Sequence, residues 1–222
     1  GGGYDEILAR LKYDGGIMTP DKFLPLIAQF NLSARFDLQV LESLLKWLAT
    51  HPCDKKGPRF SVNLMPLTLL QKNIAGRIIR LFKRYHISPQ AVILEITEEQ
   101  AFSNAESSMY NIEQLHKFGF RIAIDDFGTG LSNLKRFYEI NPDSIKVDSQ
   151  FTGDIFGTAG KIVRIIFDLA RYNRIPVIAE GVESEDVARE LIKLGCVQAQ
   201  GYLYQKPMPF SAWDKSGKLV KE

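Results

Sequence analysis

The chain has 222 residues, of which 45% are hydrophobic and 24% are charged, and its formal net charge is +2. This composition excludes a disordered chain and predicts a folded globular protein. The small net charge argues against nucleic acid as a partner, and the length suits one large domain or two small ones.

Neither the apolar runs nor the cysteines indicate a secreted or membrane-spanning chain. No apolar run is long enough to cross a bilayer, and no signal peptide opens the sequence. Cys53 and Cys196 are the only thiols, so we expect no disulfide framework and a reducing, cytoplasmic setting. We interpret residues 1–3, all glycine, as a linker or cloning remnant and residues 4–222 as a single domain.

Short apolar runs alternate with helical patterns along the whole chain. The runs are rich in Val and Ile and predict parallel strands at residues 4–10, 59–64, 91–96, 121–125, 143–148, 175–180 and 196–202. Apolar residues at three- and four-residue spacings predict helices at residues 20–30, 36–49, 73–85, 107–119, 161–172 and 184–195. Such repeated units imply an α/β fold with helices outside a parallel sheet.

These units fit either an open, doubly wound sheet or a closed barrel. No glycine-rich dinucleotide fingerprint follows the first run, which weakens the open-sheet interpretation. The sequence offers seven strands, whereas a closed barrel of this class has eight. We therefore expect a TIM-like (β/α)8 barrel whose first N-terminal strand is missing from this chain.

A polar or ionisable residue lies within or at the end of every predicted strand. In chain order these residues are Glu6, Asn63, Glu95, Asp125 with Asp126, Lys146 with Asp148, Glu180 and Gln200. A single acid after a strand is as often a capping or solvent-facing residue as a functional one. In a barrel, however, the carboxyl ends of all strands meet at one rim, so this set predicts one site.

Carboxylates that converge without cations repel one another and raise one another's pKa values. Hard divalent cations relieve this repulsion, and Mg²⁺ and Mn²⁺ prefer oxygen ligands. The three histidines show no zinc spacing. A cluster of this size fits two metal ions about 3.5–4 Å apart, an arrangement used for phosphoryl hydrolysis.

The motifs that carry these residues resemble those of the EAL phosphodiesterase family from Tyr4 to about Pro209. The family's Glu-Ala-Leu, V-N-L-S, K-I-D and Q-G-Y correspond to Glu6–Leu8, Val62–Met65, Lys146–Asp148 and Gln200–Tyr202. Its L-E-I-T-E, D-D-F-G-T-G and A-E-G-V-E occur unchanged at Leu94–Glu98, Asp125–Gly130 and Ala179–Glu183.

The resemblance implies a role for each of these residues. The metal ligands it implies are Glu6, Asn63, Glu95 and Asp125 for one ion and Asp125, Asp126 and Glu180 for the other. Lys146 would hold or deprotonate the attacking water, acting with Glu180 as a catalytic residue. The implied substrate-binding residues are Arg10, Asp148 and Gln200, and the residues implied to anchor the loop after the fourth predicted strand are Glu98, Gly128 and Glu183.

The family implies hydrolysis of cyclic di-GMP to linear pGpG with two Mg²⁺ or Mn²⁺ ions. We expect Ca²⁺ to inhibit, because it is larger and less strict in geometry than Mg²⁺. A degenerate domain that senses cyclic di-GMP or binds protein without cleavage is the alternative, but no implied ligand is lost here. A barrel enzyme acting on another phosphate ester would make every motif a coincidence.

Partners are implied by the resemblance as well. Family members are commonly fused to upstream sensor, GGDEF or membrane segments, which would tether a cytoplasmic domain to the inner membrane. They often form homodimers through helices beside the D-D-F-G-T-G loop. Residues 131–138 predict a helix with an apolar face that either forms this contact or packs against its own barrel.

Overall fold

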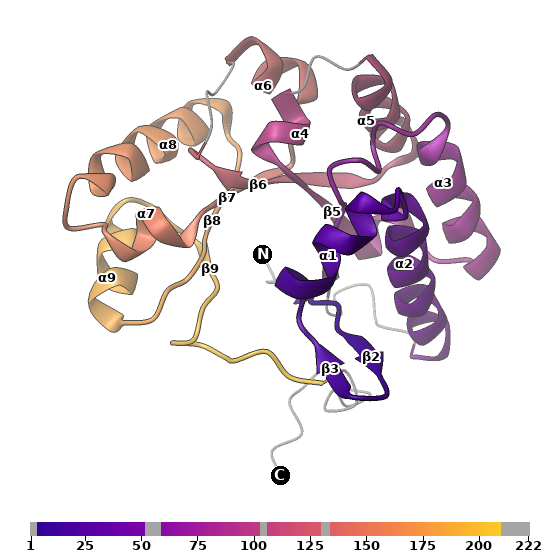
Figure 1. Cartoon of the computed structure of the whole chain (residues 1–222). Helices are drawn as coiled ribbons and strands as arrows, with labels where there is room; N and C mark the ends of the chain where they lie inside the picture. The colour runs from indigo at the N-terminus through magenta and orange to yellow at the C-terminus, as the bar shows by residue number, and fades with distance from the viewer. Residues whose placement is uncertain (1–3, 52–58, 103–105, 130–133, 210–222) are drawn as a thin grey trace. The chain divides into compact units, whose positions relative to one another are not determined.

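The computed structural model describes residues 4–51, 59–102, 106–129 and 134–209 (Figure 1). Its contacts separate two compact units. The first comprises the described parts of residues 1–94, 104–121 and 209–222, and the second those of residues 95–103 and 122–208. Residues 1–3, interpreted as a linker, lie outside the described residues, and a single domain over 4–222 stays a prediction.

Seven strands form the main sheet, in the order β1-β4-β5-β6-β7-β8-β9. Their bounds are Tyr4–Ile7 (β1), Arg59–Asn63 (β4), Val92–Thr97 (β5), Arg121–Phe127 (β6), Ser144–Val147 (β7), Val177–Ala179 (β8) and Gln198–Ala199 (β9). The registers of β1 with β4 and of β6 to β9 are parallel. Each predicted strand is thus confirmed in place, and the described residues hold no eighth parallel strand.

In the first unit, a hairpin of β2 (Leu11–Tyr13) and β3 (Gly16–Met18) follows β1 and was not predicted. Its helices are α1 (Pro20–Gln29), α2 (Ser33–Thr50), α3 (Ile74–Tyr85) and α5 (Glu106–Phe118), with a 3-10 turn, η1, at Pro89–Ala91. Leu41, Leu45 and Leu48 of α2 are buried at helical spacing, as are Ile74, Ile78 and Phe82 of α3. These faces form the core with Phe60 and Val62 of β4.

In the second unit, the helices are α4 (Glu98–Phe102), α6 (Leu134–Ile140), α7 (Ser149–Gly153), α8 (Ala159–Asn173) and α9 (Glu185–Lys193). Every residue of β7 and β8 is buried, as expected of parallel strands, although β7 includes Ser144 and Lys146 beside its apolar residues. The side chain of Ser184 caps α9 by accepting a hydrogen bond from Val187 N at 3.4 Å. No helix in the described ranges has both the length and the apolar character that crossing a membrane requires.

A buried carboxyl on α2 connects that helix to the loop that follows β4. Asp37 is 1% exposed, and its Oδ2 atom accepts hydrogen bonds from Met65 N at 2.8 Å and Thr68 Oγ1 at 2.5 Å. Its Oδ1 atom is buried without a hydrogen-bond partner in the described structure. Burial raises the pKa of Asp37 from 3.8 to about 7, although the two hydrogen bonds act in the opposite direction. The loop held in this way begins directly after Asn63.

Asp37 should make the protein less stable as the pH rises from about 4 to about 7. Over this range the folded state keeps a proton on Asp37 that the unfolded state has already lost, so the stabilisation present below pH 4 disappears by pH 7. Asp37→Asn should remove this slope, worth about 4 kcal/mol across the window. Urea unfolding of both proteins at several pH values measures it, and parallel pH profiles would contradict the assignment.

Candidate metal centre

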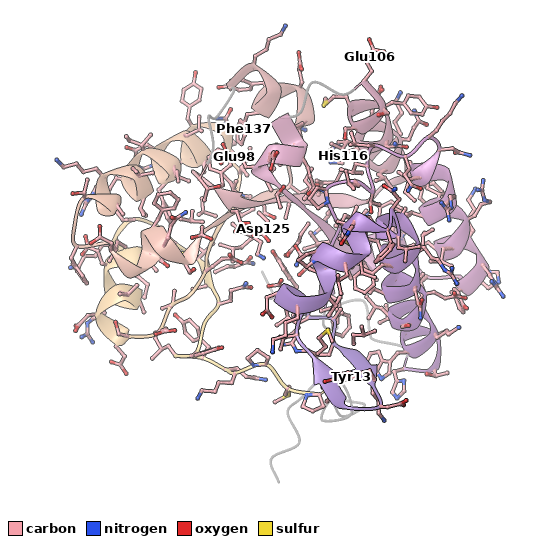
Figure 2. All side chains as sticks on the ribbon, in the orientation of Figure 1. Tyr13, Glu98, Glu106, His116, Asp125 and Phe137 are labelled. Atoms are coloured by element: carbon pink, nitrogen blue, oxygen red, sulfur yellow. The ribbon has the colours of Figure 1, made fainter. Side chains whose placement is uncertain are left out.

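The ammonium group of Lys146 lies among three carboxylates, which come from β5, from β6 and from the residue just after β8. Lys146, on β7, is fully buried, and its Nζ donates a hydrogen bond to Glu95 Oε2 of β5 at 2.8 Å. The same nitrogen lies 2.7 Å from Glu180 Oε1, just after β8, and 3.2 Å from Asp125 Oδ1 of β6. The structure therefore brings four of the predicted site residues together within the second unit, and Figure 2 labels one of them, Asp125.

This cluster carries more negative than positive charge. When all groups are ionised, one ammonium faces three carboxylates, and Glu95 is fully buried. A buried ion needs partners of opposite charge, so the excess carboxylates favour added cations. Carboxylate oxygens of Asp125, Asp126 and Glu180 lie within 4.8 Å of one another, close enough to share an ion. This all-oxygen donor set fits Mg²⁺ or Mn²⁺.

The backbone at Asp126 is irregular, and this irregularity brings its side chain beside that of Asp125. Its φ is 54°, in the left-handed region that non-glycine residues rarely adopt, and the β6–β7 register shifts between Ile124 and Phe127. Asp126 N donates a hydrogen bond to Asp125 Oδ1 at 3.0 Å. This bulge places two adjacent carboxylates near one another, whereas consecutive residues of a regular strand point to opposite faces.

The position of Asp126 changes its proton affinity. Burial and then the negative charge of Asp125 raise the pKa of Asp126 from 3.8 to about 6. A hydrogen bond with Asp148 and the charge of Asp148 act in the same direction, while Lys146 opposes them. Below pH 6 the cluster therefore keeps a proton on this carboxyl, and a bound cation would compete with that proton.

The loop after β6 is attached to α4. Glu98 is 2% exposed, and its Oε2 accepts a hydrogen bond from Gly128 N at 2.8 Å, as expected of an anchoring residue. Gly128 has φ of +102°, and a Cβ there would come within 2.9 Å of Ile166 Cδ1. Gln100 caps α4, since its Oε1 accepts from Thr97 N at 2.6 Å. The loop continues into residues 130–133, which lie outside the described part of the chain.

Glu180 is held by hydrogen bonds from two further segments. Gln200 Nε2 donates to Glu180 Oε1 at 2.7 Å, and the hydroxyl of Thr152 donates to the main-chain oxygen of Glu180. Thr152 is fully buried on α7, whose first turn is capped by Asp148 through a 2.6 Å hydrogen bond from Gln150 N. Thr152 was not among the predicted site residues, although its position one turn after the capping Asp148 could have indicated it.

The remaining predicted site residues belong to both units. In the first unit, Asn63 Nδ2 donates to Glu6 Oε1 at 2.7 Å across the parallel β1–β4 pair. Arg10 is exposed, and its guanidinium donates to Ala9 O at 2.9 Å. Glu183, in the second unit, is also exposed. The structure thus joins Glu6 to Asn63, while the roles of Arg10 and Glu183 stay predictions.

Comparison with known proteins gives consistent matches over almost the whole chain. The model of the EAL domain family matches residues 4–207. The chain is 75% identical over 213 residues to the probable cyclic di-GMP phosphodiesterase PdeA of Escherichia coli K12, covering 95% of this chain and 29% of the relative. It is 58% identical to the probable cyclic di-GMP phosphodiesterase PdeI of the same organism, covering 98% and 28%.

A solved structure agrees with these sequence matches. The PaMucR phosphodiesterase in its c-di-GMP complex superposes with a TM-score of 0.86 at 31% identity, covering 94% of this chain and 91% of that one. This likeness confirms the fold class predicted from the strand–helix units. The chain spans less than a third of the length of the two E. coli relatives.

Removing the ammonium group should expose the repulsion inside the cluster. Lys146→Met keeps a chain of similar length but leaves the buried carboxylates without their common cation, which should lower the free energy of unfolding at pH 7 by about 3–5 kcal/mol. Urea unfolding measures this loss, which should shrink at pH 5 or with added Mg²⁺ because either neutralises carboxylates. Lys161→Met, on the exposed surface of α8, is the matched control. Equal stability of the two variants would refute the proposed repulsion.

Proposed function

The chain belongs to the EAL domain family, and from that premise we propose that it hydrolyses cyclic di-GMP to linear pGpG with two bound divalent cations. One observation carries the proposal, namely the buried Lys146 among Glu95, Asp125 and Glu180. The two E. coli relatives are named as probable cyclic di-GMP phosphodiesterases, and the similar PaMucR structure is a c-di-GMP complex. These names and the intact cluster support an enzyme of the same class.

The proposed ligands belong to two overlapping sets. One set is Glu6, Asn63, Glu95 and Asp125, and the other is Asp125, Asp126 and Glu180. Mg²⁺ or Mn²⁺ held there would lower the pKa of water and offset charge on the reacting phosphate. Carboxylate and amide oxygens alone make up both sets, which is the donor chemistry these ions prefer.

The protein's own groups orient the reaction. Lys146 would hold the attacking water and carry positive charge close to the phosphate, while its contacts keep three carboxylates at fixed positions. Gln200 orients the carboxylate of Glu180, and Glu98 fixes the loop that follows Asp126. The exposed guanidinium of Arg10 has the fork geometry that suits the second phosphate. Asp148 and Gln200 would position the substrate.

Asp125→Asn should lower turnover of cyclic di-GMP by a factor on the order of 10³ or more, because the shared ligand loses its charge. Chromatography of cyclic di-GMP and pGpG with Mg²⁺ present measures turnover. Asp168→Asn, on the exposed face of α8, is the matched control and should be fully active. Chelation should abolish turnover, and Ca²⁺ should inhibit it because that ion is larger and less strict in geometry.

Two results would contradict this function. Full activity of Asp125→Asn, or full activity after chelation, would refute the metal mechanism. Tight binding of cyclic di-GMP without any product would assign the alternative role of a sensor that does not cleave its ligand. Calorimetric titration with cyclic di-GMP beside the turnover assay separates these outcomes.

We also propose a homodimer through α6, with sensor, GGDEF or membrane segments fused upstream in the longer protein. Phe137 of α6 is buried against Phe127, with ring centroids 5.7 Å apart, so this side chain packs inside its own unit. Tyr138, its neighbour, is 55% exposed and is available to a second copy. Residues 131–133, at the start of the predicted apolar face, lie outside the described residues.

Tyr138→Glu should therefore shift sedimentation toward the monomer and lower specific activity, because the helix adjoins the loop that follows Asp126. Tyr110→Glu on α5 is the matched control, since Tyr110 is 58% exposed. Sedimentation velocity and specific activity are measured over the same range of protein concentration. A monomeric variant with full activity would refute coupling between α6 and the site.

A further inference from the structure

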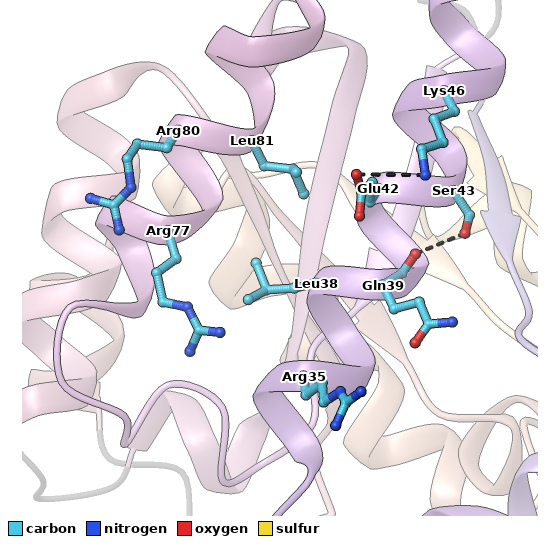
Figure 3. A pocket seen from close by; sticks show the side chains of 9 residues that line it. All are labelled: Arg35, Leu38, Gln39, Glu42, Ser43, Lys46, Arg77, Arg80 and Leu81. Atoms are coloured by element: carbon cyan, nitrogen blue, oxygen red, sulfur yellow. Dashed lines mark hydrogen bonds and ion pairs between the residues drawn. The ribbon is translucent and has the colours of Figure 1, made fainter.

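A groove between α2 and α3 in the first unit shares no residue with the carboxylate–lysine cluster (Figure 3). Its volume is about 590 Å³. Leu38 of α2 and Leu81 of α3 point into the space between the two helices, and both are half-buried. Four cations also line the groove, namely Arg35, Lys46, Arg77 and Arg80.

The polar face of α3 contains cations only. This helix holds Arg77, Arg80, Lys83 and Arg84 and no acidic residue. Other helices of the chain pair their cations with nearby acids, as Lys117 does with Glu113 and Arg171 does with Asp168. The guanidinium groups of Arg35, Arg77 and Arg80 make no ion pair or hydrogen bond with any residue that the structure describes. Their donors therefore remain available to a ligand.

The only carboxylate that lines the groove among the described residues is already engaged. Glu42 accepts a hydrogen bond from Tyr85 OH at 2.7 Å and lies 3.6 Å from Lys46 Nζ and 3.7 Å from Arg84 Nη1. These contacts, led by the Tyr85 hydrogen bond, hold the pKa of Glu42 below its ordinary value. Glu42 thus compensates Lys46 and Arg84 but leaves the three arginines uncompensated.

The dimensions and chemistry favour a peptide over a small anion. Arg35 and Lys46 are eleven residues apart on α2, or about 16 Å along the helix axis, which is longer than one phosphate group can bridge. Leu38 and Leu81 offer apolar contact to a ligand in the groove. The planar guanidinium groups of the arginines can each donate two parallel hydrogen bonds to a carboxylate. The net charge of +2 gives no broad positive field of the kind that nucleic acid binding requires.

We propose that this groove binds an acidic amphipathic peptide segment of a partner protein, with its apolar row on Leu38 and Leu81 and its carboxylates on the arginines. In this mode of recognition, apolar side chains at helical spacing on the peptide pack into the groove. Charged residues beside them speed association and disfavour other partners. This surface would connect the domain to a partner through residues that take no part in the proposed hydrolysis.

The test uses a synthetic peptide with leucines at helical spacing and glutamates between them. Calorimetry should detect its binding to the wild-type chain, and Arg35→Glu/Arg77→Glu should weaken that binding at least tenfold. Leu81→Ser should also weaken it, without any change of charge. Lys161→Glu/Arg171→Glu, on the exposed face of α8, matches the charge change and should bind as the wild type does.

Further measurements on the same variants make the result decisive. Circular dichroism and cyclic di-GMP turnover should be unchanged in the groove variants, which shows that neither the fold nor the proposed function accounts for the loss. If the α8 control weakened peptide binding equally, the loss would be due to net charge alone, and the proposal would be overturned. Stronger binding to duplex DNA or to phosphatidylglycerol vesicles, lost in the same groove variant, would also overturn it, as would no binding of the acidic peptide.

Discussion

The site depends on the contacts that the ammonium group of Lys146 makes with three carboxylates. This group joins Glu95, Asp125 and Glu180, which arise from three different strands or strand ends, so the register of β5 to β8 and the position of each carboxylate are determined together. One ammonium does not neutralise three carboxylates, and the remaining charge favours cations. A cation that bound these carboxylates only in the folded state would therefore also stabilise the fold.

A second set of contacts holds the backbone of these acids. Glu98 binds the amide of Gly128 beyond Asp126, and Thr152 binds the carbonyl of Glu180. Asp37 performs the same task in the first unit for the loop that begins after Asn63. In each case a side chain from a helix satisfies a main-chain group of a strand-end loop. Loops are usually the more mobile parts of a protein, so these hydrogen bonds fix the backbone beside Asp126, Glu180 and Asn63.

The strands were predictable because most are short runs rich in Val and Ile, and part of the site was predictable because Asp125 and Glu180 end two of the predicted runs. The hairpin at Leu11–Met18 was not predicted, since its strands have three residues each and are mostly exposed. The hydrogen bond from Thr152 to Glu180 was not predicted for a different reason. A sequence pattern tells which element holds a residue but not which carbonyl its hydroxyl reaches. The left-handed backbone at Asp126 likewise has no signature in residue spacing.

That backbone at Asp126 restricts how the domain can change by mutation. With φ at 54°, most side chains at this position would add strain of about 1 kcal/mol or more, whereas asparagine and glycine adopt this conformation readily. A lineage that kept this fold would therefore reach asparagine or glycine here more easily than any bulky residue. Because Asp126→Asn and Asp126→Gly both remove a carboxylate from the acidic cluster, either change in a natural descendant would mark a fold that outlasted its proposed cation site.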